Sequence, residues 1–188
     1  TEAAGMYNTL MSAGEPALVV ECLNGYRSKE RLPSNLGEFK VPLGIPEVVR
    51  KGNDLTVVSY GSTFNLCVQA AKTLSEFDVE VELIDVRTLL PFDLNGTIAD
   101  SVSRTHRVLF VDEDVPGGAS AYMMERSLST GELWQHLDAA PETLSAAPHL
   151  PAYGTDGDYF SKPSHEDIVE KAYAMVAEGD PSSYPDLI

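Results

Sequence analysis

The side chains that could do chemistry in this sequence are few and scattered. The four histidines, His106, His136, His149 and His165, do not cluster with each other or with the two cysteines at the spacing of a zinc site. Each is explained more simply as a surface or capping residue. The sequence contains neither a glycine-rich phosphate loop nor a Gly-x-Ser-x-Gly nucleophile turn. Self-contained catalysis is therefore not predicted.

Two short segments resemble chemical sites only in part. Tyr60-Gly61-Ser62 places a hydroxyl beside a glycine, but no base lies nearby in the sequence, so a strand end followed by a helix start explains it better. Residues 154–159 are acidic and contain two glycines, and carboxylates suit magnesium and calcium. Because the spacing is not that of a calcium loop and the closing glutamate is missing, we expect a solvated turn there.

Composition limits the classes of protein that remain. A length of 188 residues suits one sizeable core, and 29 acidic against 13 basic residues give a formal net charge of −16. Phosphate backbones would repel such a surface, so no nucleic-acid partner is expected, whereas a basic protein partner stays open. No apolar run is long enough for a membrane span, so no membrane partner is expected. The first residue is not Met, which suggests a piece of a longer polypeptide.

The two cysteines indicate the compartment. Cys22 and Cys67 do not form the dense framework of a secreted disulfide protein, so we expect a reducing, cytoplasmic location. Cys67 falls within a helical pattern and is expected to be a small buried apolar residue rather than a nucleophile.

Hydrophobic periodicity predicts the elements that would position any site. Strands are expected at residues 17–21, 47–50, 55–60, 79–86, 108–111 and 142–146. Helices are expected at residues 4–12, at 65–77, and from Gly117-Gly118 to about 128. Ser62 or Thr63 is expected to cap the second of these. Two further helices are expected, one capped by Asp93 with Leu94, Ile98 and Val102 on one face, and one capped by Ser164. Strands alternate with helices from residue 55 onward. The fold class is therefore α/β: a three-layer α/β/α domain over about 46–178 with a mostly parallel five-stranded sheet, in which the strands beginning near residues 55, 81 and 108 are parallel neighbours.

Several segments, in this order, carry a resemblance to a known family. They are Val41-Pro-Leu-Gly44, Val48 to Gly61, Ile84 to Asp93 (IDVRTLLPFD), Ser101 to Arg107, Val111-Asp-Glu-Asp114 with Gly117-Gly118, and Leu137-Asp-Ala-Ala-Pro141. Together they resemble the C-terminal, transketolase-type domain of the beta subunit, or of a fused alpha–beta chain, of thiamine-diphosphate-dependent 2-oxo acid dehydrogenases. Two features depart from that pattern: the family's usual arginine after the Leu-Asp-Ala-Pro stretch is missing, and residues 148–163 are longer and more polar.

The resemblance implies a division of the chain and of the chemistry. Residues 1–26 would be the end of the preceding pyrimidine-binding domain, 27–45 a linker, and 46–188 the transketolase-type domain. The whole enzyme would use thiamine diphosphate and magnesium to decarboxylate a 2-oxo acid and pass the acyl group to a lipoyl group. This chain lacks the family's Gly-Asp-Gly…Asn signature, since Gly157-Asp158 is followed by Tyr159. The fragment is therefore expected to bind no cofactor and to be inactive alone.

The resemblance also implies partners and roles for individual residues. The expected partners are a second copy of the same domain, the thiamine-binding domains of the same enzyme, and a basic peripheral domain of a lipoyl-bearing acyltransferase, with residues 180–188 as candidate docking segment. No catalytic, cofactor-binding or metal residue is expected. The motif residues with an expected interface or structural role are Arg87, Thr88, Pro91, Asp93, Glu113, Gly117 and Gly118. A cation and a capping carboxylate would order the loop around Pro91, and the last three would follow an apolar strand, where open α/β sheets place ligand sites.

Alternatives remain at this point. Within the enzyme class, the chain could be the C-terminal domain of transketolase or deoxyxylulose-phosphate synthase. Outside it, the chain could be a non-enzymatic acidic module that binds a basic protein. Pyruvate and branched-chain 2-oxo acids are both open as substrates, with the branched-chain type preferred.

Overall fold

A five-stranded sheet lies at the centre of the molecule. A computed structural model describes residues 2–27, 29–130, 132–151, 153–154 and 156–185. The strands are β1 (Glu47–Arg50), β2 (Leu55–Ser59), β3 (Val81–Asp85), β4 (Val108–Val111) and β5 (Glu142–Leu144). The helices are α1 (Glu2–Ala13), α2 (Gly61–Ser75), α3 (Thr97–Thr105), α4 (Ala119–Ser129), α5 (Gly157–Ser161) and α6 (His165–Gly179), with 3-10 helices η1 (Leu23–Arg27) and η2 (Leu133–His136). None of the helices in this described part of the chain is long and apolar enough to cross a membrane.

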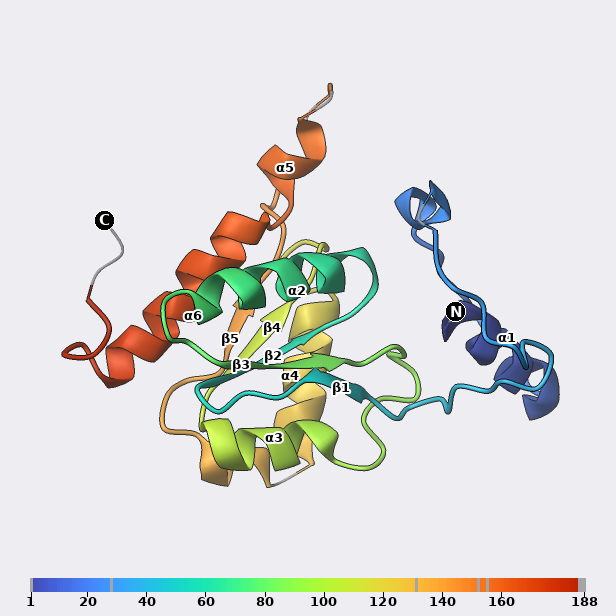
Figure 1. Ribbon diagram of the computed structural model, residues 1–188, viewed down its shortest axis with the longest axis horizontal. Coiled ribbons are helices and arrows are strands. Elements are labelled where there is room, and N and C mark those ends of the chain that lie inside the picture. The colour runs from blue at the N-terminus through green and yellow to red at the C-terminus, as the bar shows by residue number, and fades with distance from the viewer. Residues whose placement is uncertain (1, 28, 131, 152, 155, 186–188) are drawn as a thin grey trace.

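The strand order is β1-β3-β2-β4-β5, with β2 in the middle (Figure 1). β2 is parallel to both β3 and β4, and Val57 pairs with Leu83 on one side and Leu109 on the other. β5 is parallel to β4, and only β1 runs antiparallel, beside β3. The prediction of a mostly parallel five-stranded sheet is confirmed, as is the prediction that the strands starting near residues 55, 81 and 108 are parallel neighbours.

Both faces of the sheet are covered, so its strands are buried on both sides. Leu55 and Val57 point to one face, where α2 and α6 pack, while Val58 and Ile84 point to the other, where α3 and α4 pack (Figure 1). Alternate residues of a strand face opposite sides, which is why one strand feeds two cores. The expected three-layer α/β/α architecture is confirmed.

The helix boundaries differ from the expectations in two places. α2 begins at Gly61 rather than near Asn65, and its N-cap is Tyr60 without a side-chain bond, so the prediction that Ser62 or Thr63 caps it is wrong. α3 begins at Thr97, which leaves Leu94 outside the helix and 67% exposed. Ser164 does cap α6, in a reciprocal capping box with Asp167.

The N-terminal segment lies beside the sheet rather than in it (Figure 1). The expected helix is present as α1, which packs through Gly5 against Phe39 and Val41. The expected buried strand at residues 17–21 is wrong: every residue from 11 to 21 is exposed, and no strand forms there. Leu18 is 91% exposed. An apolar run becomes a strand only where a neighbouring edge supplies hydrogen bonds, and the described chain offers this run none.

Candidate functional site

The motif residues lie at the carboxyl edge of the sheet, where open parallel sheets place their ligand sites. β2, β3 and β4 run in the same direction, so the loops that follow them emerge at one edge. The loop after β3 carries Arg87 to Asp93, and the loop after β4 carries Glu113 to Gly118. Because β2 separates β3 from β4, the structure brings these residues together as two groups, one on either side of Tyr60.

Arg87 ties the N-terminal segment to the sheet. Its side chain is only 11% exposed, and its Nη1 atom lies 3.0 Å from Glu2 Oε1 and 3.2 Å from Glu47 Oε2. Its Nη2 atom donates to the carbonyl of Ile45 at 2.9 Å. Burial, with the neighbouring Glu47, raises the pKa of Glu2, against the opposing effect of Arg87. Arg87 therefore acts as an ordering cation between α1, the segment before β1 and the end of β3.

Thr88 and Pro91 hold the same loop from within. The Thr88 hydroxyl accepts from the backbone N–H of Gly44 and donates to the carbonyl of Pro91, both at 2.8 Å. Gly44 has φ +73°, and a Cβ there would lie 2.9 Å from atoms of Leu94 and Pro91. The Leu90–Pro91 peptide bond is cis. Each of these contacts is structural.

Asp93 caps α3 from three residues outside the helical N-cap. Its two carboxylate oxygens accept from the backbone N–H groups of Thr97 at 2.8 Å and Ile98 at 3.1 Å. Burial raises its pKa, and the two N–H donors oppose that effect. The predicted capping carboxylate is present, because these donors belong to the unpaired first turn of a helix.

The loop after β4 is acidic, and its Glu113 is paired with a lysine from another part of the chain. Glu113 Oε2 lies 2.9 Å from Lys162 Nζ, just beyond α5. Gly117 has φ +94°, and a Cβ on Gly118 would lie 2.4 Å from the Asp114 carboxylate. The glycines thus allow the chain to turn closely past Asp114 into α4. The expectation that this group follows an apolar strand is confirmed.

Asp112 is a residue of this edge that the sequence argument did not single out. It is 1% exposed, and its carboxylate accepts from the Tyr60 hydroxyl at 2.9 Å and from the Ser120 N–H at 3.1 Å. Burial and the Asp112 charge raise the pKa of Tyr60 well above its usual range. The signal that could have found it is the acidic residue directly after a fully apolar strand. Asp112 joins the ends of β2 and β4 to the start of α4.

No catalytic constellation appears among the described residues. His106 Nδ1 bonds the carbonyl of His136 at 2.9 Å, and His165 Nε2 lies 3.1 Å from the Thr73 hydroxyl. Within the described ranges, no three His, Cys, Asp or Glu side chains are grouped so as to hold a metal ion. The arrangement at the carboxyl edge can order loops and present a surface, and it contains no nucleophile–base pair.

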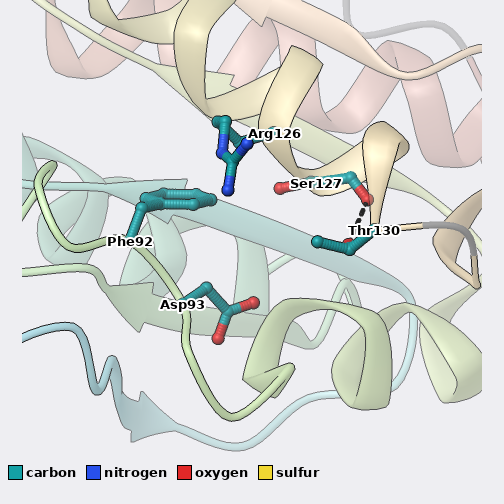
Figure 2. Close-up of a pocket in the computed structure, with 5 residues that line it drawn as sticks. All are labelled: Phe92, Asp93, Arg126, Ser127 and Thr130. Atoms are coloured by element: carbon teal, nitrogen blue, oxygen red, sulfur yellow. Dashed lines mark hydrogen bonds between the residues drawn. The ribbon is translucent and has the colours of Figure 1, made fainter.

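A small cleft lies beside this edge, between the loop after β3 and the end of α4. It is lined by Phe92, Asp93, Arg126, Ser127 and Thr130 (Figure 2). Asp93 thus belongs both to the motif group and to the cleft.

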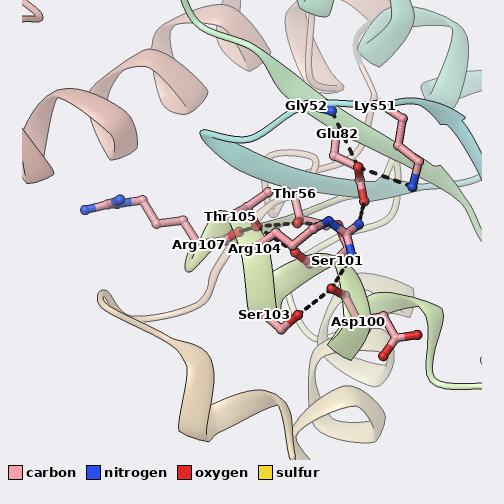
Figure 3. Close-up of polar contacts among 10 residues, drawn as sticks. All are labelled: Lys51, Gly52, Thr56, Glu82, Asp100, Ser101, Ser103, Arg104, Thr105 and Arg107. Carbon is pink, nitrogen blue, oxygen red and sulfur yellow. Dashed lines mark hydrogen bonds and ion pairs between the residues drawn. The ribbon is translucent and has the colours of Figure 1, made fainter.

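The opposite edge of the sheet holds a buried polar network (Figure 3). Glu82 is fully buried, and its carboxylate pairs with Arg104 and lies 3.7 Å from Lys51 Nζ. On the neighbouring strand, the Thr56 hydroxyl bonds Ser101 at 2.7 Å and Thr105 at 2.6 Å. These bonds fasten α3 to the sheet, and the buried side chains of Glu82, Thr56, Ser101 and Thr105 all have partners.

Residues 44–161 match the family described as the transketolase C-terminal domain. The similar curated proteins include the pyruvate dehydrogenase E1 component subunit beta of Chlorokybus atmophyticus, which is 35% identical over 79% of this chain and 43% of its own length. The subunit of the same name from Staphylococcus epidermidis is 30% identical over 93% of this chain and 53% of its own length. The chain therefore spans about half the length of these relatives.

The fold has a counterpart among solved structures. A split-gene transketolase, described as an inactive beta4 tetramer, superposes with a TM-score of 0.59 over 79% of this chain and 45% of its own. The two sequences are 20% identical, so this likeness concerns the fold alone.

Proposed function

Because this chain belongs to the transketolase C-terminal domain family, we propose that it serves as that domain in the decarboxylating component of a thiamine-diphosphate-dependent 2-oxo acid dehydrogenase. The observation that carries the proposal is the sequence match to pyruvate dehydrogenase E1 beta subunits, at 35% identity over 79% of the chain. The observed α/β sheet agrees with it. In this role the chain supplies loops and surfaces, and the whole enzyme performs the decarboxylation.

The residues of this chain do not fit thiamine diphosphate and magnesium. At the carboxyl edge, Glu113 is paired with Lys162 and Asp112 is satisfied by Tyr60 and Ser120. A diphosphate brought to this acidic edge would meet like charges, whereas diphosphate sites offer N–H donors and cations. We therefore place the cofactor in the domains of the whole enzyme that precede this one.

The N-terminal segment supports this division of the enzyme. The apolar run at residues 17–21 is exposed, and Leu18 and Val20 are 91% and 84% exposed. We propose that residues 1–26 complete the preceding domain, that 27–45 are the linker, and that 46–188 are the transketolase-type domain. The exposed run would then become a strand when it meets the sheet of that domain.

We further propose pyruvate as the substrate of the whole enzyme. The sequence alone preferred a branched-chain substrate, but no substrate pocket supported that preference. The pyruvate dehydrogenase subunits to which this chain is similar favour pyruvate instead. Pyruvate decarboxylation with acyl transfer to a lipoyl group is the corresponding reaction.

The proposed partners are a second copy of this domain and a basic peripheral domain of the acyltransferase. The formal charge of −16 suits a basic partner, because complementary charge speeds encounter and selects partners. Residues 180–185 remain a candidate docking segment, and residues 186–188, which were part of the same expectation, lie outside the described residues. A cytoplasmic location stays a proposal as well.

A substrate comparison on the full-length protein tests the proposed function. The enzyme, with its partner subunit where the alpha chain is separate, is assayed for thiamine-diphosphate-dependent decarboxylation of pyruvate and of a branched-chain 2-oxo acid. A ketose-phosphate donor with an aldose-phosphate acceptor is assayed in parallel. We expect pyruvate to give the highest kcat/KM. Ketol transfer without decarboxylation would instead favour transketolase.

A further inference from the structure

The cleft beside the carboxyl edge contains an unusual pair of hydrogen-bond donors. One wall is formed by Phe92 and Asp93, in the loop after β3, and the other by Arg126, Ser127 and the C-cap residue Thr130, at the end of α4 (Figure 2). The Arg126 guanidinium and the Ser127 hydroxyl face the same gap, next to the Phe92 ring (Figure 2). No other part of the proposed function uses this gap.

The Ser127 hydroxyl is a buried group without a partner. Ser127 is 4% exposed, and its Oγ atom is buried with no hydrogen bond to any described residue. Leaving a buried hydroxyl unpaired is unfavourable, and most buried polar atoms in folded proteins have a partner. A ligand with an acceptor atom in the cleft would supply one.

Arg126 adds a charged donor at the same place. Across the described residues, its side chain forms no ion pair or hydrogen bond. This is notable in a chain with 29 acidic and 13 basic residues. A guanidinium has only donors, and its fork geometry matches a carboxylate. The two unpaired groups therefore call for an acceptor that carries negative charge.

The groups around Arg126 and Ser127 limit the charge of such an acceptor. The Thr130 N–H donates to the Arg126 carbonyl at 3.3 Å, and the Thr130 hydroxyl donates to the Ser127 carbonyl at 3.0 Å. Both carbonyls at the end of α4 therefore already have donors. The Asp93 carboxylate is bonded to α3, at 2.8 and 3.1 Å, but it still places one negative charge at the cleft. That charge disfavours a dianion, while the Phe92 ring suits a short carbon chain.

We propose that this cleft binds a small monocarboxylate. Its oxygens accept from the Arg126 guanidinium and the Ser127 hydroxyl, and its carbon end lies against the Phe92 ring. The proposed site needs only residues of this chain.

The test is a titration of the 188-residue chain with acetate, followed by two-dimensional NMR at an ionic strength held constant with chloride. The reporters are the amides of Ser127 and Thr130 and the Nε–H of Arg126. We expect saturable shifts at these reporters, and weaker binding of sulfate, a dianion. R126Q should weaken acetate binding by at least about tenfold, because hydrogen bonds to charged groups are the stronger ones. S127A should weaken it about two- to tenfold, as expected for one neutral hydrogen bond.

Two further variants separate the site from general charge effects. R126K keeps the charge but loses the fork, so its binding should fall between wild type and R126Q. K72Q removes one charge from the exposed part of α2 and should leave acetate binding unchanged. Four results would each overturn the proposal. They are shifts that stay linear with acetate concentration, equal acetate binding by R126Q and wild type, equal losses of acetate binding in K72Q and R126Q, and tighter binding of sulfate than of acetate. Unfolding midpoints of all variants show that they remain folded.

Discussion

Single residues at the carboxyl edge act mainly on the backbone around them. Thr88 bonds two loop backbones at 2.8 Å, Asp93 caps a helix, and Arg87 holds the carbonyl of Ile45 at 2.9 Å. Two of these residues also have positive φ, +57° at Arg87 and +39° at Asp93. Such conformations cost free energy in residues other than glycine, and Asp and Asn tolerate them best. The loop after β3 is thus held in shape by its own side chains.

The capping role of Asp93 predicts a graded effect on stability. D93A removes both acceptors at the start of α3 and puts a less tolerant residue at φ +39°, so it should lower the free energy of unfolding by about 1–2 kcal/mol. D93N keeps one acceptor and tolerates this φ, so its loss should be about half as large. Urea unfolding of the three proteins measures this. Equal stability of D93A and wild type would contradict the capping role.

The two cysteines should differ sharply in reactivity. Cys67 is 1% exposed, and burial raises the pKa of its thiol to about 12, so almost no thiolate is present at neutral pH. Cys22 is partly exposed on the N-terminal segment. A thiol reagent should therefore modify Cys22 quickly in the folded chain and Cys67 only in denaturant. In C22S, rapid modification before unfolding would show that Cys67 is accessible and the account of it wrong.

At the scale of elements, α3 depends on a buried ion pair at the amino edge of the sheet. The Glu82 side chain is 1% exposed, whereas that of Arg104 is 44% exposed. Removing Glu82 and removing Arg104 should therefore lower the stability by different amounts. Arg104 can be hydrated when its partner is lost, whereas Glu82 stays buried.

Substitutions of this pair should show that asymmetry. R104M leaves the buried Glu82 carboxylate with the Gly52 N–H at 3.4 Å and Lys51 Nζ at 3.7 Å, so it should cost about 2–4 kcal/mol of stability. E82Q removes the buried charge and lets Arg104 hydrate, so it should cost about 1 kcal/mol. K51M is the matched control and should cost less than about 1 kcal/mol, because the Lys51 side chain is 74% exposed. Chemical unfolding that finds E82Q less stable than R104M would contradict this account.

Elements with their own periodicity were predictable from the sequence, and those that need a partner were not. β2 and β4 are short apolar runs between turn residues, and α6 has both a capping serine and an apolar stripe, so local pattern sufficed. The run at residues 17–21 has the same apolar pattern but no strand beside it, and pattern alone cannot supply the missing edge.

The residues of the candidate site likewise fall into those that the sequence could predict and those that it could not. Asp93 was predictable because capping is local, and its partners lie four and five residues ahead. Arg87 bonds Glu2, 85 residues away, and Asp112 bonds Tyr60, 52 residues away. Such pairings depend on how distant segments pack. The Arg126–Ser127 cleft likewise depends on α4 lying beside the loop after β3.

At the scale of the whole molecule, the sheet and its covering helices should fold without the N-terminal segment. Apart from Arg87, few side chains of the sheet domain hold that segment, and a partly exposed ion pair such as Arg87–Glu2 contributes about 0–1 kcal/mol. A chain that begins at Pro42 should therefore unfold cooperatively, with a stability within about 1 kcal/mol of the 188-residue chain. Circular dichroism and urea unfolding measure this. Loss of cooperative unfolding would show that residues 1–41 belong to the same folding unit.

The central claim is that this chain supports a thiamine-dependent enzyme without holding its cofactor. Isothermal titration calorimetry of thiamine diphosphate with magnesium tests it most directly, with the 188-residue chain and the full-length enzyme titrated side by side. The account predicts saturable binding to the full-length enzyme and no measurable binding to the isolated chain, because the residues at its carboxyl edge are paired and acidic. Binding to the isolated chain with a Kd of about micromolar, equivalent to about 8 kcal/mol, would contradict it.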